Sequence, residues 1–528
     1  MLHTKNKLGL RSLLMLICAI VVLAGCSGGK PAETPSASPA TPDKAADKGS
    51  RILTIGMPTD MVSFDIHNHN TILTEAIHIN MFSYLFKRNS DLEIKPDLVD
   101  SYKVVDDTTW EFKLKKGITF HNGDPLTSAD VKYTLERVAK DKALKENPNY
   151  KQIKEVKIID DANFQILTDG PQPALLNRLS RIGSGILPKA YIEKNGFDNF
   201  LAKPVGSGPF KFVEWVRDDR VVLEAYENYF EGRVKDWDRV VFRKIPEDSS
   251  RVNELLAGGV DLIVNVPSNM VNVVNAQDKT QAIKATSNRV GLLAVRNTKG
   301  LPTADPKVRE AIDLAINKKA LADTVLGGYA TPTRTRVTPG NFGADPSLFN
   351  TSLYDPEKAK QLLKEAGYGS GLTITLSSPT GVYTKDKEVS EMIQAMLGEV
   401  GIKVNLELME RTKFTEMRAA GKNKELFLAS YGNSLFDADT ALDVYRTEKA
   451  KTELDYSNKE VDDLLKAALV NMNPKDRTAQ YQRIQKIVAD ERPHIYLYSE
   501  QGLYGVKKTI NFKPRTDEML YVPEITKK

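Results

Sequence analysis

Three histidines close together in this sequence have a spacing that fits metal chemistry. His67 and His69 would lie on the same side of an extended segment, as two ligands of one ion must, and His78 follows closely in the chain. The alternative, which we favour, is that they are polar loop and capping residues beside Asn68 and Asn70. We therefore assign no metal ligand and no cofactor.

A second pair, Asp437 and Asp439, has the residue types of an acid/base couple that could cleave a glycosidic bond. Residues two apart point the same way only on a strand, and acidic pairs on loops are usually solvated or cap helices. The phosphate-loop, zinc-helix and nucleophile-elbow motifs are absent from residues 51–528. The run Gly206-Ser207-Gly208-Pro209 has the spacing of a tight turn. We expect no catalytic residue and no enzyme activity.

The first 26 residues have the pattern of an export signal. Lys5, Lys7 and Arg11 precede an apolar run at 13–23 that is too short to cross a bilayer of about 30 Å. The run ends in Leu-Ala-Gly-Cys, which resembles a bacterial lipobox. This predicts a signal peptide at 1–25 and acylation of Cys26 by chains such as palmitate. An ordinary signal peptide with a coincidental cysteine is the alternative.

The composition of the chain after Cys26 changes at residue 51. Residues 27–50 hold four prolines and no aromatic residue, which predicts a flexible tether after the acylated cysteine, at 26–50 in all. The only other cysteine, Cys18, lies in the signal, so no disulfide can form. The 528-residue chain is 41% hydrophobic, and its 74 Lys and Arg nearly balance 69 Asp and Glu. It should form large globular domains, and a nucleic-acid clamp is excluded.

From residue 51 onward the pattern is mixed α/β. Apolar and polar residues alternate at 110–115 as in a half-buried strand. Thr127 is expected to cap a helix that begins just after it, and Asp355 and Pro356 are expected to start another. A strand at 372–376, a helix at 390–400 and a strand at 402–408 predict a βαβ unit with parallel strands.

These segments together resemble the family 5 extracellular solute-binding proteins, the oligopeptide-, dipeptide- and nickel-binding components of ABC importers. The similarity extends over essentially all of 51–528. It is carried by residues 52–56, 63–67, 81–85, 110–112, 117–131, 204–210, 305–312, 354–359 and 493–498.

The resemblance implies an α/β, two-lobed, periplasmic-binding-protein-like fold (type II, cluster C) with an extra inserted domain and a hinge between the lobes. Lobe I would comprise 51–88, 201–288 and 496–528, the insert 89–200, and lobe II 289–495. A ligand bound between the lobes would favour a closed state that the permease subunits of an ABC transporter recognise. The protein would be a monomeric lipoprotein on the outer face of the bacterial cytoplasmic membrane.

The resemblance also suggests where a peptide amine would bind. Peptide-binding members hold it with the first aspartate of a Trp-x-x-Asp-x-x-Asp-Pro stretch, matched here by 429–439. If Asp437-Ala438 replaces Asp-Pro, the position falls on Ser434, which has no charge, and a standard zwitterionic peptide is in doubt. A shifted alignment would bring Asp437 or Asp439 into the role instead.

The remaining ligand candidates are of three kinds. Arg334 and Arg336 could pair with a carboxylate or phosphate, the alternative being surface salt bridges. Tyr383, Tyr431 and Phe436 could stack on a ligand, the alternative being core packing. By the family layout, residues 67–70 would lie near the cleft mouth.

Several ligands and functions stay open. The first hypothesis is an importer component that captures a peptide or peptide-like solute, and its alternatives are an opine, a sugar conjugate or chelated nickel. A surface receptor without transport and an exported hydrolase are the other classes.

Overall fold

The computed structural model describes residues 51–528, which form one compact unit. The predicted signal peptide, Cys26 and the tether lie outside the described residues. Within 51–528 no helix is long and apolar enough to span a membrane.

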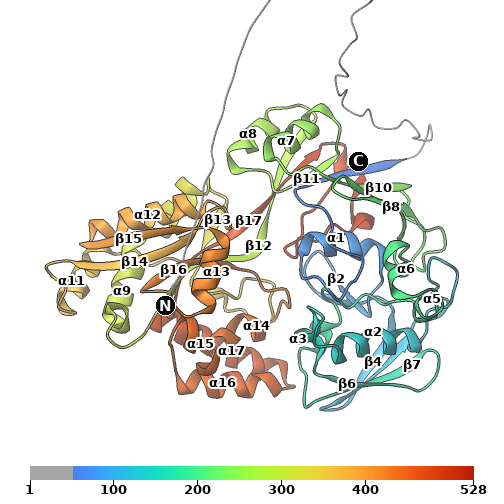
Figure 1. Ribbon diagram of the computed structural model, residues 1–528, viewed down its shortest axis with the longest axis horizontal. Coiled ribbons are helices and arrows are strands. Elements are labelled where there is room, and N and C mark those ends of the chain that lie inside the picture. The colour runs from blue at the N-terminus through green and yellow to red at the C-terminus, as the bar shows by residue number, and fades with distance from the viewer. Residues whose placement is uncertain (1–50) are drawn as a thin grey trace, which may run out of the picture. The chain divides into compact units, whose positions relative to one another are not determined.

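An 11-stranded mixed sheet runs through the unit (Figure 1). Strand β13 (Ala330–Pro332) pairs with β17 off the main row. The main row, in spatial order, is β15 (Ile402–Met409), β14 (Leu372–Pro379), β16 (Leu426–Tyr431), β12 (Thr280–Val295), β17 (His494–Lys507), β11 (Leu262–Val264), β1 (Ile52–Met57), β10 (Arg239–Lys244), β9 (Arg220–Ala225) and β8 (Phe210–Val216).

Two long antiparallel strands, β12 and β17, join the two ends of this sheet. The first part of β12 pairs with the end of β17, and β11 pairs with the same end of β17. The last part of β12 lies between β17 and β16. The register of β12 against β17 shifts between Thr286 and Val290. The sheet is therefore continuous in hydrogen bonding but irregular at its centre.

The predicted βαβ unit is confirmed. Strands β14 and β15 are parallel from Leu372↔Ile402 to Pro379↔Met409, and α12 (Asp386–Glu399) packs on both. Helices α9 (Pro306–Ala315) and α11 (Pro356–Glu365) add to the same apolar core, and Asp355 caps α11 as expected.

The other side of this end of the sheet has a second core, built around buried side chains such as Tyr445 and Tyr481. Its helices are α13 (Arg411–Ala419), α14 (Ala438–Leu442), α15 (Thr447–Glu453), α16 (Lys459–Val470) and α17 (Pro474–Glu491).

A separate four-stranded antiparallel sheet has its own core. Trp110, Phe112 and Leu114 of β5 are buried, as their alternation predicts, and α2 (Ser128–Lys140) covers the sheet with Thr127 in a capping box. In spatial order the strands are β4 (Val99–Asp106), β5 (Thr109–Leu114), β7 (Asn163–Thr168) and β6 (Ile153–Ile158). Short helices α3 (Asn147–Tyr150), α4 (Leu175–Arg178), α5 (Lys189–Asn195) and α6 (Phe197–Ala202) lie nearby in the chain.

The remaining elements belong to several cores. Helix α1 (Ile72–Met81) and strand β18 (Ile510–Asn511), which pairs with β19 (Thr526–Lys527), pack with β1. Helices α7 (Asp248–Ala257) and α8 (Val271–Asn275) share a core with β11. The β2 (Phe86–Arg88) and β3 (Ile94–Pro96) pair joins the core of the four-stranded sheet, and α10 (Lys318–Ala320) packs against the core of α9 and α11.

The glycine run at 206–209 corrects one expectation. Neither Gly206 nor Gly208 has a positive φ, so the segment is not a glycine-dependent tight turn. A Cβ on Gly206 would lie 2.0 Å from the Met81 carbonyl oxygen, and one on Gly208 would lie 2.6 Å from the Met81 carbonyl carbon. The glycines are needed because two backbones touch here.

Candidate functional site

The segment 431–439 leaves the end of β16 and lies against residues from far apart in the chain. Tyr431 is opposite Val290 of β12, so the segment begins next to the irregular centre of the sheet. The Asn433 backbone N–H donates to Asn288 Oδ1 (3.0 Å), and its side-chain amide donates to the Asp437 carbonyl (2.8 Å). These bonds fix the shape of the segment.

Asp437 is a structural residue. It is fully buried and accepts two hydrogen bonds from Arg477 at 2.7 and 2.8 Å, a bidentate ion pair. It also caps α14 by accepting from the Asp439 N–H (3.0 Å). Both carboxylate oxygens are committed, so Asp437 can serve neither as an amine anchor nor as a catalytic acid.

Three buried arginines from much earlier in the chain contact segment 431–439. Arg181 Nη2 donates to Ser434 Oγ at 3.0 Å, and Arg178 of α4 pairs with Asp439 at 3.3 Å. Arg88, at the end of β2, donates to the Leu435 carbonyl at 3.0 Å. Ser434, the position at which the resemblance places a peptide amine, is thus in contact with a guanidinium.

These arginines retain unused hydrogen-bonding capacity. Each of Arg88, Arg178 and Arg181 has an Nε without a hydrogen-bond partner among the described residues. Burial lowers the pKa of Arg88 to about 10, which leaves it charged at neutral pH, and burial also lowers the pKa of Arg178. Arg181 is neutralised in part by Glu146. Arg178 and Arg181 each pair with a carboxylate, whereas Arg88 has no ion pair within residues 51–528, and this remaining positive charge favours an anionic ligand group.

A second cationic group lies at the start of the same segment. The Arg336 guanidinium stacks 4.6 Å from the Tyr431 ring centre, and within 51–528 its side chain has no hydrogen bond or ion pair. Arg418 donates to the Tyr431 hydroxyl and pairs with Glu453 at 3.0 Å. Tyr383 is partly buried against the same core as Tyr431. The structure therefore brings together three predicted residues: Arg336, Tyr383 and Tyr431.

Other predicted residues lie elsewhere or serve packing. Arg334 donates to the Ala489 carbonyl and pairs with Asp490, both at 3.1 Å, so the salt-bridge alternative holds for it. Phe436 is 7% exposed and packs under Arg88 at 4.9 Å.

The histidines predicted near a cleft mouth are buried instead. His67 and His69 are both 0% exposed, whereas Asn68 between them is exposed. His67 Nδ1 accepts from Arg137 (2.6 Å), and burial together with that charge lowers its pKa to about 3. The expectation that these histidines face a ligand is wrong, because the segment turns them into the interior.

Arg88, Arg178, Arg181 and Arg418 were missed by sequence reasoning. They belong to no motif, and α4 is only four residues long, so no helical periodicity marks it. Their common role emerges only when distant segments meet.

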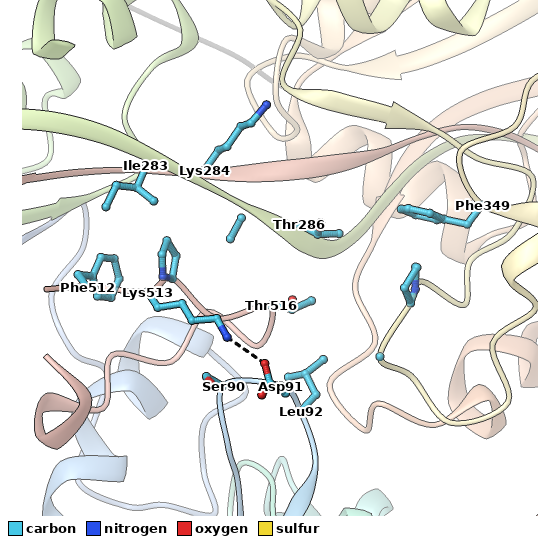
Figure 2. Close-up of a pocket in the computed structure, with 14 residues that line it drawn as sticks. Ser90, Asp91, Leu92, Ile283, Lys284, Thr286, Phe349, Phe512, Lys513 and Thr516 are labelled. Atoms are coloured by element: carbon cyan, nitrogen blue, oxygen red, sulfur yellow. Dashed lines mark hydrogen bonds and ion pairs between the residues drawn. The ribbon is translucent and has the colours of Figure 1, made fainter.

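A cavity of about 710 Å³ lies beside the irregular stretch of β12, between residues 90–92, 283–286, 339–340 and 512–516. Figure 2 shows Lys513 and Asp91 paired on one side of it, at 2.9 Å, with Lys284 pointing away from them. Phe349 points in from another segment. None of the predicted ligand residues lines this cavity.

Comparison with known proteins identifies the family. The profile of the bacterial extracellular solute-binding proteins, family 5 Middle, matches residues 93–453, more than half of the chain. The glutathione-binding protein GsiB of Escherichia coli K12 is 30% identical over 468 residues, which are 86% of this chain and 90% of that protein.

Solved structures agree. AgaA of A. tumefaciens R10, in complex with agropinic acid, is 26% identical with a TM-score of 0.70, covering 90% of this chain and 96% of that one. HbpA2 of Haemophilus parasuis is 21% identical with a TM-score of 0.81, covering 90% and 100%. The chain belongs to the family 5 bacterial extracellular solute-binding proteins, the substrate-binding components of ABC importers, and has their two-lobed α/β fold.

Proposed function

We propose that this protein captures an acidic, peptide-like solute between its lobes and delivers it to the permease subunits of an ABC importer. It acts as a monomer, without catalysis, held on the outer face of the cytoplasmic membrane by acylated Cys26 and the tether at 26–50. Lobe I is 51–88, 201–288 and 496–528, the insert is 89–200, and lobe II is 289–495.

The central strands support this division. Separate apolar cores lie on either side of the register shift at Thr286 to Val290, and only β12 and β17 run through both parts of the sheet. Two strands that connect two separately packed cores can bend at the residues where their hydrogen bonding is irregular. The hinge is therefore placed at this shift.

The contact of Arg181 with Ser434 carries the ligand assignment. By the family resemblance, a peptide-binding member has a carboxylate at this position to hold an ammonium group. Here an uncharged hydroxyl accepts from a guanidinium that also has a free Nε. An ammonium would be repelled, whereas a carboxylate could take the place of the hydroxyl.

Arg336 supplies a second anion site. It is held by stacking on Tyr431 rather than by a carboxylate, so its hydrogen-bonding edge is available. Two of the relatives fit a ligand with acidic groups: GsiB is a glutathione-binding protein, and glutathione has two carboxylates beside its one ammonium, and AgaA is complexed with agropinic acid.

The test is calorimetric titration of the chain from residue 27 onward with reduced glutathione and with its dimethyl ester. We expect the acid to bind and the ester to bind at least tenfold more weakly. Arg336→Met should weaken acid binding by a similar factor. Arg334→Met is the matched control, because Arg334 is already paired with Asp490, and it should leave affinity unchanged. Equal binding of acid and ester would refute the anionic-ligand assignment.

Ligand released from the protein by denaturation provides an independent check. Mass spectrometry should find compounds with free carboxylates after purification under mild conditions. A neutral or purely cationic compound would contradict the proposal even if glutathione itself does not bind.

A further inference from the structure

The geometry points to a zinc site in lobe I, formed by His69, Glu75 and His78 and separate from the solute site. We propose that these three side chains hold one Zn²⁺ ion that ties the loop before α1 to the helix itself. The ion is a structural component of the lobe and not the transported solute.

The three ligand atoms lie at the spacing that zinc requires. His69 Nε2 is 3.2 Å from His78 Nδ1 and 3.6 Å from Glu75 Oε2, and His78 Nδ1 is 3.8 Å from the same oxygen. In a tetrahedral site with bonds of about 2.0–2.1 Å, neighbouring ligand atoms are about 3.3 Å apart. Small shifts of the three side chains would therefore supply three of the four ligands of one ion, and a water molecule enclosed with it would supply the fourth.

Neighbouring groups hold two of the three ligands, His78 and Glu75, in the orientation that metal binding needs. His78 Nε2 is 2.9 Å from the Ser63 carbonyl, which can only accept, so Nε2 carries the proton and the Nδ1 lone pair faces the cluster. The Tyr84 hydroxyl donates to Glu75 Oε1. The other oxygen, Oε2, is the one that faces both histidines.

Glu75 Oε2 is the observation that sets this cluster apart from an ordinary buried histidine pair. It is fully enclosed and has no hydrogen-bond partner among the described residues. A direct bond between His69 and His78 satisfies one nitrogen of each ring but leaves this oxygen unused. Buried polar atoms rarely lack a hydrogen-bond partner. A cation at the centre of the cluster would bind His69 Nε2, His78 Nδ1 and Glu75 Oε2 together.

The site is closed to solvent. His69 and His78 are 0% exposed and Glu75 is 3% exposed, so the ion would be acquired during folding rather than from a cleft. Glu75 and His78 are three residues apart on α1 and share one face of the helix, and His69 reaches them from the preceding loop. This His-x5-Glu-x2-His spacing is not that of a zinc-protease helix.

The first experiment measures the metal content of the full chain, refolded from urea with excess Zn²⁺ and then desalted. We expect about one zinc per chain, a higher Tm than after refolding with EDTA, and, with Co²⁺, the visible absorption of a tetrahedral site. The proposal would be overturned if the folded wild-type protein retained no zinc, had the same Tm after refolding with zinc and with EDTA, and gave no visible absorption with Co²⁺.

Variants then locate the ion. Glu75→Gln and His69→Gln keep size and polarity but should lose the bound zinc and the zinc-dependent Tm shift. His67→Gln is the matched control, since His67 is equally buried but contacts Arg137 instead. Zinc retained by both triad variants, or lost equally from the control, would show that the ion lies elsewhere. Because solute binding depends on Arg336 rather than on this cluster, failure of either proposal leaves the other intact.

Discussion

The Arg181 guanidinium lies 3.0 Å from the Ser434 hydroxyl, at the position where a peptide amine would bind in the peptide-binding members that the sequence resembles. Where the resemblance places a carboxylate, this chain has a hydroxyl that accepts a hydrogen bond from a cation. One residue of this contact can therefore be changed to test the ligand class directly.

Ser434→Asp should weaken binding of an acidic solute by at least tenfold. The new carboxylate would pair with Arg181 and repel the ligand anion at the same place. Titration calorimetry with reduced glutathione measures the change, and Ser434→Asn, which adds similar bulk without charge, is the control. Unchanged affinity in the aspartate variant would place the ligand's acid group away from Arg181.

Asp437→Asn should lower the free energy of unfolding by about 3–5 kcal/mol, because it leaves the Arg477 charge buried without its partner. Urea denaturation followed by circular dichroism checks this. Asp439→Asn, which removes a longer and partly exposed pair with Arg178, should cost less. If both variants lost the same stability, the buried pair would have no special role.

Gly206→Ala should destabilise the fold by roughly 1–3 kcal/mol, since the added methyl meets the Met81 carbonyl and the two backbones must separate. Gly398→Ala in α12 is the matched substitution: its Cβ would meet nothing within 4 Å, and helix propensity favours alanine by about 1 kcal/mol. Opposite changes in Tm are expected. A neutral Gly206→Ala would show that the close approach relaxes easily.

His121 should make the protein less stable as the pH falls. Its Nδ1 accepts from the Gly206 N–H (3.2 Å) and its Nε2 donates to the Gly208 carbonyl (3.0 Å), so only the neutral ring satisfies both bonds. Burial lowers the pKa of His121 from 6.5 to about 4. Between those values the unfolded chain binds more protons than the folded one, and stability is lost as the pH falls through this range.

Unfolding in urea at several pH values tests this linkage. The decline in stability from about pH 6.5 to pH 4 should be shallower in His121→Asn than in wild type, by on the order of 2 kcal/mol. The asparagine keeps an acceptor near the position of Nδ1 but does not titrate. Parallel pH profiles would show that His121 is protonated in the folded protein.

Much of the fold could be read from local patterns. The alternation in β5, the caps Thr127 and Asp355, and the parallel βαβ unit of β14, α12 and β15 were predicted because each depends on neighbouring residues only. The candidate site was predicted less completely. Arg336, Tyr383 and Tyr431 do come together, whereas Arg334 and Asp437 have structural partners that no local pattern reveals.

The sequence by itself determined the family, the α/β class and the absence of cysteines from residues 51–528, because motif order and composition are properties of the chain alone. Only the tertiary structure decided that a cation faces Ser434, that His67 and His69 are interior, and that Glu75 joins His69 and His78. Those outcomes depend on contacts between segments far apart in sequence or on which way a loop turns, and burial and charge pairing are set only when the segments meet.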